Sequence, residues 1–161
     1  MLVTLAERTE AHVRIYFQKA GREAIRKFLP QKAKTVEEAL EDYRKTLFPN
    51  ATSYGATILA DGRYIGDVWC YCIDREDTPN AMISYCIFEE EYWGRGIATE
   101  AVKLFLSVIQ SKYSFQTLGA FTYAENIASI RVLEKNGFSK AEEFCEEGVR
   151  SVYMQRQFPI K

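Results

Sequence analysis

The chain has 161 residues, of which 47% are hydrophobic and 14% are aromatic, and its formal net charge is −1. This composition predicts one folded domain over residues 1–161 and excludes a disordered chain. The charge argues against a nucleic-acid partner, because contacts with phosphates need a basic excess. No apolar run is long enough to span a membrane, and residues 1–8 lack the features of a signal peptide, so we expect a cytoplasmic protein without a membrane partner.

The residues that bind metals are few and scattered. The only histidine, His12, falls in the first turn of a predicted helix, where we expect a surface residue without a catalytic partner. The four cysteines lie in strand-like runs without a C-x-x-C pair, at Cys70, Cys72, Cys86 and Cys145. We therefore expect no metal site, reduced thiols in the core, and no covalent acetyl carrier at Cys86.

The first third of the chain predicts a strand followed by helices. A short strand at residues 3–6 leads to Thr9, which can cap a helix that ends at Gly21. A second short helical piece stops at Pro30, and Thr35 to Glu38 fits a capping box for a third helix. The apolar positions that give these helices one buried face are Val13, Tyr16, Phe17, Ala20, Ile25, Phe28, Leu29, Leu40, Tyr43 and Leu47.

Strand patterns begin after residue 52. Residues 57–60 and 64–73 flank Asp61-Gly62, which predicts a hairpin, and a polar loop then leads to a buried strand at residues 82–88. Three consecutive antiparallel strands therefore precede a turn that contains Gly94 and Gly96.

The elements after this turn predict a crossover. The longest helix ends near Tyr113, and the next strand, residues 118–123, should lie parallel to residues 82–88. Asn126 can cap a further helix that turns Ile127, Ile130 and Leu133 towards the core and ends at Asn136-Gly137. Residues 138–145 and 149–155 form a last hairpin around Glu147-Gly148.

The glycine turn has the properties of an anion-binding site. Gly94 and Gly96 allow a tight turn and close approach of a ligand to the backbone, and the helix that starts there directs its unpaired N–H groups to the same point. A Gly-x-Gly turn by itself also suits a simple loop or a dinucleotide-binding fold. We disfavour the latter, a dinucleotide oxidoreductase, because Thr99 replaces the third small residue and the preceding strands look antiparallel.

Two segments together resemble one known family. They are Trp93-Gly94-Arg95-Gly96-Ile97-Ala98-Thr99-Glu100-Ala101 and Asn126-Ile127-Ala128-Ser129-Ile130-Arg131-Val132-Leu133-Glu134-Lys135-Asn136-Gly137-Phe138. Their combination resembles the GNAT superfamily of acetyl-CoA-dependent N-acetyltransferases, in the branch of the Rim-type ribosomal-protein and spermidine acetyltransferases. The resemblance implies an α+β fold with a mixed, mostly antiparallel sheet of about seven strands flanked by helices, and a splayed parallel pair after the crossover helix.

The resemblance also implies which residues bind coenzyme A. The turn from Trp93 to Thr99 would hold the pyrophosphate through backbone N–H groups, with Arg95 and Lys135 reaching the phosphates. The pantetheine arm would pair with the backbone of the preceding strand end and with the helix cap that follows the crossover. These positions are Ile87, Phe88, Glu89 and Asn126.

The catalytic residues are less clearly implied. One Rim-type class uses a glutamate and a tyrosine at positions that are Phe121 and Leu133 here, and Glu91 replaces a common residue of the glycine loop. We therefore consider other groups for the chemistry of acetyl transfer. The candidates for the base are Glu89 and Glu125, with Glu90 behind them. A backbone N–H near Phe88 would stabilise the oxyanion. Ser129 would interact with the departing thiolate, and Tyr123 is an alternative acid.

Two functions remain open at the level of the sequence. The first is acetyl transfer from acetyl-CoA to a primary amine on a protein N-terminus, a polyamine or another small molecule. The second is a non-catalytic acyl-CoA-binding or interaction module. Acidic clusters at residues 89–91, 142–143 and 146–147 could attract a cationic amine or could be solvated surface, and we expect a monomer or a homodimer.

Overall fold

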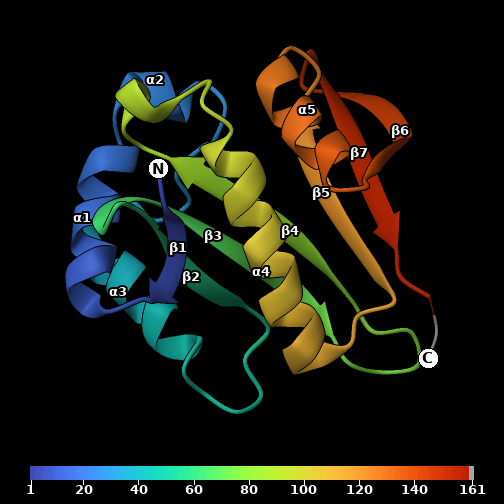
Figure 1. Ribbon diagram of the computed structural model, residues 1–161, viewed down its shortest axis with the longest axis horizontal. Helices are drawn as coiled ribbons and strands as arrows, with labels where there is room; N and C mark the ends of the chain where they lie inside the picture. The colour runs from blue at the N-terminus through green and yellow to red at the C-terminus, as the bar shows by residue number, and fades with distance from the viewer. Residues whose placement is uncertain (160–161) are drawn as a thin grey trace.

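The computed structural model describes residues 1–159 and contains one seven-stranded sheet. The strand order is β1-β2-β3-β4-β5-β7-β6 (Figure 1). The strands are β1 (Val3–Glu7), β2 (Tyr54–Ala60), β3 (Arg63–Asp74), β4 (Asn80–Ile87), β5 (Thr117–Tyr123), β6 (Ser139–Glu146) and β7 (Val149–Gln157). The helices are α1 (Glu10–Ala20), α2 (Glu23–Arg26), α3 (Val36–Lys45), α4 (Ile97–Tyr113) and α5 (Ile127–Lys135).

One pair of neighbouring strands is parallel, and it separates along its length. Strands β4 and β5 pair only over Asn80–Met82 and Thr117–Gly119, whereas all other neighbours are antiparallel. Figure 1 shows β5, α5, β7 and β6 diverging from the rest of the sheet beyond this contact. The predicted α+β fold with a mixed sheet and a splayed parallel pair is therefore confirmed.

The sheet has two differently covered faces. On one face α4 buries Phe105 and Ile109 against strand residues such as Ile58 and Ile83. On the other face α1 and α2 pack over the aromatic and thiol side chains of β3 and β4, namely Trp69, Cys86 and Phe88. Strand alternation explains the division, because Ile83 and Ile87 of β4 face α4 while Cys86 and Phe88 face α1.

The predicted turns and caps are present. Asp61 and Gly62 both have positive φ, 49° and 84°, which matches the twist of a tight hairpin. Thr9 and Thr35 cap α1 and α3 through their side chains. Thr35 and Glu38 do not complete a capping box, because the Glu38 carboxylate accepts from the Lys34 N–H in place of the Thr35 N–H.

Two sequence-based expectations were wrong in detail. Cys72 and Cys145 are exposed, so only Cys70 and Cys86 are core thiols. Ile127 is 52% exposed and does not face the core. His12 is a partly exposed surface residue, as expected, and its Nδ1 accepts from the Thr9 N–H at 3.1 Å, which completes the α1 cap.

Residues 1–159 lack both a membrane-spanning helix and a cluster of metal-binding side chains. No helix in this part of the chain has the length and apolar character needed to cross a membrane. The same residues contain no group of three or more side chains suited to hold a metal ion.

Candidate active site

The glycine turn joins β4 to the start of α4. A short 3₁₀ turn, η1 (Glu90–Tyr92), comes first, and Gly94 and Gly96 then adopt positive φ values of 72° and 76°. Among the described residues, nothing lies within 4 Å of where a Cβ would stand on either glycine. The N–H groups of residues 97–99 have no helical partners, as at the start of any helix. No side chain caps α4 in their place. This geometry suits an anion, as predicted.

The cationic side chains proposed for the phosphates lie next to this turn. The exposed Arg95 places its guanidinium 5.7 Å from the centre of the Tyr92 ring. Lys135 is exposed in the last turn of α5, and its neighbour Asn136 donates to the Thr99 carbonyl at 3.2 Å. This hydrogen bond connects the C-terminal end of α5 to the first turn of α4 beside the glycine turn.

Beyond Met82, where its pairing with β5 ends, β4 stays paired with β3 as far as Ile87. The Phe88 N–H donates to the Ile65 carbonyl on β3 at 3.0 Å, and the Phe88 carbonyl accepts from Arg22 at 3.1 Å. Both main-chain groups of Phe88 are therefore occupied. Because strand hydrogen bonds alternate in side, the N–H of Ile87 is directed to the gap instead.

The Ile87 carbonyl is also occupied in this structure. It accepts from the indole Nε1 of Trp93 at 2.8 Å. This contact fixes Trp93, which is 45% exposed, against the strand that leads into the turn. Trp93 thus has a structural contact in addition to its predicted place beside the coenzyme.

Two hydroxyl groups meet between β4 and α5. The Tyr85 hydroxyl lies 2.6 Å from Ser129 Oγ and 3.1 Å from the Ser129 carbonyl. Burial raises the pKa of Tyr85 to about 12, against the opposing effect of the hydrogen bond with Ser129, so the phenol stays protonated at neutral pH. Sequence reasoning selected Ser129 and missed Tyr85. The signal available was a hydroxyl-bearing side chain between Ile83 and Ile87 on the α4 side of β4.

The remaining residues of the predicted site lie near the end of β5. The Asn126 side chain accepts from the Ser129 N–H at 3.2 Å, as expected of a helix cap. Glu125 is exposed in the connection from β5 to α5, and Tyr123 is partly exposed at the end of β5. Leu133 is buried and Phe121 is 56% exposed. Both side chains are hydrocarbons, so neither residue supplies an acid or a base.

Glu89 is held in a network of cations. Its carboxylate contacts Lys19, Arg22 and Arg63, the last two at 3.6 Å, and its side chain is 12% exposed. The hydrogen bond from Lys19 is the main cause that lowers the pKa of Glu89, against an opposing effect of burial. A carboxylate held in this way is a weak base. Glu91 also pairs with Arg63, at 2.8 Å, so two residues of the first acidic cluster are already neutralised.

The family of the chain follows from a comparison with known proteins. Residues 3–139 match the acetyltransferase (GNAT) domain, and the chain belongs to this family. Over 87 residues it is 34% identical to the probable N-acetyltransferase YjcK of Bacillus subtilis (strain 168). That match covers 54% of this chain and 48% of the relative, so the chain spans about half the length of the curated relative it matches.

Solved structures of the same fold include several acetyltransferases. The spermidine N-acetyltransferase of Vibrio cholerae, bound to CoA and spermine, has a TM-score of 0.85 at 18% identity, covering 96% of this chain and 95% of that one. AAC(6')-Ib with ribostamycin and coenzyme A has a TM-score of 0.80 at 18% identity, covering 98% and 94%. RimL, a ribosomal L7/L12 alpha-N-protein acetyltransferase, has a TM-score of 0.81 at 17% identity, covering 96% and 93%.

Proposed function

We propose that this protein transfers an acetyl group from acetyl-CoA to a primary amine by direct attack of the amine on the thioester. The observation that carries this proposal is the uncapped glycine turn at the start of α4, which opens beside the gap between β4 and β5. Membership of the acetyltransferase family supports it. The names of the fold relatives, which include acetyltransferases of polyamines and aminoglycosides, support the reaction class.

The residues around the turn fit the coenzyme. Each helix-end N–H contact with an anion is worth about 0.3–1 kcal/mol, so the groups of residues 97–99 together can hold a diphosphate. Arg95 and Lys135 would add charge from two sides. Bound acetyl-CoA would supply an activated thioester, and its acyl carrier arm would lie in the gap beside Ile87 and Glu89.

The groups that face the gap divide the chemical work. The Ile87 N–H, which is directed to the gap, would stabilise the oxyanion. One donor of this kind contributes about 2.7–4 kcal/mol. Ser129 would donate a hydrogen bond to the departing sulfur. Tyr85 would position Ser129, because its hydroxyl donates to the Ser129 carbonyl at 3.1 Å and lies 2.6 Å from Ser129 Oγ.

The amine must lose a proton, because a lysine-like amine has a pKa near 10.4. Glu89 is a poor candidate for this base in view of its three cationic partners. We propose that the exposed Glu125, directly or through water, accepts the proton, with Tyr123 beside it at the end of β5. Replacement of Glu125 by glutamine should then lower kcat and leave coenzyme binding unchanged.

A second candidate function is a coenzyme-binding module without turnover. It is favoured by the aromatic Phe121 and the buried Leu133 at two positions where the related enzymes carry acid–base residues. Isothermal titration with acetyl-CoA, followed by a thiol-release assay over peptides, polyamines and aminoglycosides, separates the two functions. Binding without thiol release supports the module, and failure to bind ends both proposals.

A further inference from the structure

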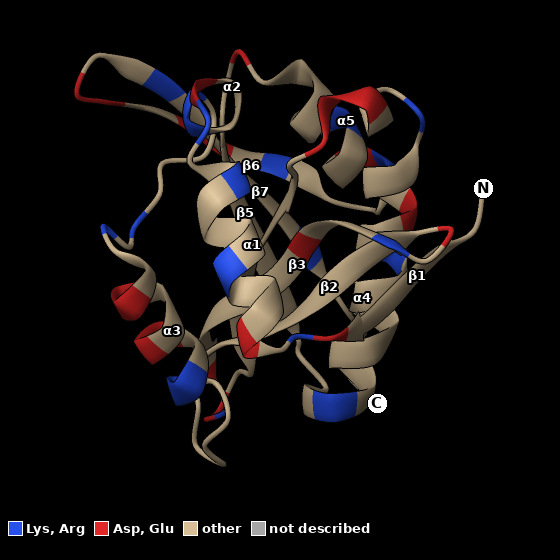
Figure 2. Cartoon of the chain, turned by 90° about the vertical axis from the view of Figure 1, so that its left-hand side faces the viewer, with Lys and Arg blue, Asp and Glu red and all other residues tan. Residues whose placement is uncertain are grey.

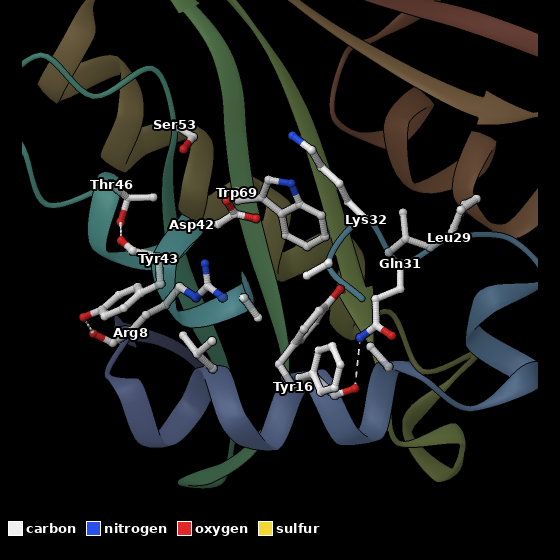
Figure 3. A pocket seen from close by; sticks show the side chains of 16 residues that line it. Arg8, Tyr16, Leu29, Gln31, Lys32, Asp42, Tyr43, Thr46, Ser53 and Trp69 are labelled. Carbon is white, nitrogen blue, oxygen red and sulfur yellow. Dashed lines mark hydrogen bonds between the residues drawn. The ribbon is translucent and has the colours of Figure 1, made fainter. Parts of the chain in front are cut away.

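A pocket of about 250 Å³ lies on the face of the sheet opposite α4. Figure 3 shows α1 along one side of it and the Trp69 side chain in front of the sheet. Most of its wall is apolar or aromatic, and charged groups line it at Arg8, Lys32 and Asp42. We call it the α1–α3 pocket, because α1, α3 and the chain between them supply most of the lining.

The α1–α3 pocket adjoins the acceptor side of the gap. Trp69 lies opposite Ser84 in the β3–β4 register, so it is one strand, about 5 Å, from the strand that borders the gap. The Tyr16 ring lies 6.1 Å from the Trp69 ring and 6.2 Å from that of Phe88. The glycine turn and Ser129 lie on the α4 side of the sheet. An amine that enters from the opposite face would therefore place its tail over Ser84, in the direction of the pocket.

Two carboxylates near this path, Asp67 and Glu89, already have cationic partners. Asp67 is 1% exposed beneath Arg8, with 3.1 Å between Asp67 Oδ2 and the guanidinium, and its other oxygen accepts from the Tyr64 hydroxyl at 2.6 Å. Glu89 is held by three cations, as described above. In the described part of the chain the remaining carboxylate of the pocket is Asp42, and Lys32 lines the same pocket with opposite charge.

This distribution decides which acceptor tail is favourable. A tail with a second ammonium group would be desolvated among mostly apolar and aromatic side chains, in a lining that carries two cations, Arg8 and Lys32, and one carboxylate, Asp42, and this is costly. An alkyl or aromatic tail would instead displace water from the same walls and gain about fourfold in affinity per buried CH₂.

We propose that the α1–α3 pocket binds the apolar tail of the acceptor, so that the substrate is a monoamine on an alkyl or aromatic skeleton rather than a polyamine. The inference rests on the proposed acetyl transfer and names its substrate class. It gives the pocket a role in specificity that is separate from the coenzyme site.

Three acceptors with the same eight-carbon chain test the proposal: octylamine, octane-1,8-diamine and 8-aminooctanoate. We expect kcat/KM for octylamine to exceed the values for the other two by about tenfold or more, since they place a charge where octylamine places a methyl group. Equal or higher values for the diamine or the amino acid overturn the proposal. If other amines of the thiol-release panel are acetylated and octylamine is not preferred, the proposed function stands and this inference fails. If no amine is acetylated although acetyl-CoA binds, both fail.

A pocket-filling variant tests the location. Ala39 lines the pocket from α3, and leucine suits a helix, so Ala39→Leu should narrow the pocket without unfolding α3. We expect KM for octylamine to rise about tenfold, whereas KM for ethylamine and the Kd of acetyl-CoA stay unchanged. Ala11→Leu, at an exposed position of α1 outside the pocket, is the matched control and should change none of these values. An unchanged KM for octylamine in Ala39→Leu contradicts the proposed location.

Discussion

Ser129 and Tyr85 connect two segments that are 44 residues apart in the chain. Their hydroxyl oxygens are 2.6 Å apart, in the region where β4 has lost β5 as a neighbour. Because the Tyr85 phenol is protonated at neutral pH, it can act as a permanent donor to Ser129. The role that we propose for Tyr85 is therefore one of positioning, exerted through Ser129.

A double-mutant cycle measures this dependence. We expect Tyr85→Phe to lower kcat about tenfold, as the loss of one hydrogen bond would, and Ser129→Ala to lower it by about 10². The double variant should have the kcat of Ser129→Ala alone, because Tyr85 acts through the serine. KM for acetyl-CoA should stay constant throughout. Independent effects that multiply would show that Tyr85 acts by another route, and urea unfolding of each variant controls for stability.

Asp67 makes the stability of the fold depend on pH. Burial raises its pKa from 3.8 to about 6, against the opposing effects of Arg8 and of the hydrogen bond from Tyr64. The folded state then binds the proton more tightly than the unfolded state, so this group lowers the free energy of unfolding as pH rises from about 4 to about 6. A difference of about two pH units corresponds to about 3 kcal/mol.

Urea unfolding at several pH values tests this expectation. The wild-type protein should lose stability relative to Asp67→Asn between pH 4 and pH 6, with a constant difference above pH 6.5. Glu89 and Glu143 have lowered pKa values and act in the opposite direction, but they are present in both proteins and cancel in the difference. Parallel curves for the two proteins would mean that Asp67 has no raised pKa.

At the scale of elements, the glycine turn is the most direct link between sequence and site. Gly96 and Gly62 have similar backbone angles, with φ of 76° and 84°, and open space where a Cβ would stand. They differ in location, because Gly62 closes the β2–β3 hairpin and Gly96 starts α4. They form a matched pair for separating backbone strain from ligand binding.

We expect Gly96→Ala and Gly62→Ala to lower the free energy of unfolding by similar amounts, about 1–2 kcal/mol each. Only Gly96→Ala should weaken acetyl-CoA binding, by about tenfold or more, because the added methyl group and the shifted backbone disturb the N–H groups of the turn. Thermal unfolding and isothermal titration give the two quantities. Equal coenzyme affinity in the two variants would remove the turn from the binding site.

Local chemistry explains why most elements were predictable. The threonine caps, the Asp61-Gly62 turn and the Asn126 cap each act within a few residues, and the structure has all of them. The exposure of Ile127 was not predictable, because helical spacing shows which residues share a face but not how much of the helix is covered. The ion pairs of Glu89 were not predictable for a similar reason, since its partner Lys19 lies 70 residues earlier.

At the scale of the whole molecule, the sheet separates the two proposed sites. The α4 face carries the glycine turn and Ser129, and the opposite face carries the α1–α3 pocket. Figure 2 shows basic segments along α1 and both acidic and basic segments on α3, around that second face. A short sequence pattern could predict the first site, because two continuous motifs form it.

The α1–α3 pocket could not be predicted in the same way. It is built from separate segments around Arg8, Tyr16, Leu29, Asp42 and Trp69, which no local pattern joins. The resemblance to a family predicts where the coenzyme would bind, but the acceptor depends on the side chains that the tertiary fold brings together.

The central claim is that the gap beside the glycine turn brings an acetyl group and an amine together. Acetyl-CoA labelled with carbon-13 in the acetyl group, incubated with the protein and octylamine, tests it most directly by mass spectrometry and thiol release. We predict labelled N-acetyloctylamine in amounts equal to the thiol released, and product formation about 10³-fold slower in the Gly96→Ala, Ser129→Ala double variant when acetyl-CoA is below saturation. Saturable binding of acetyl-CoA with no labelled amide from octylamine or any other amine of the panel would contradict the claim.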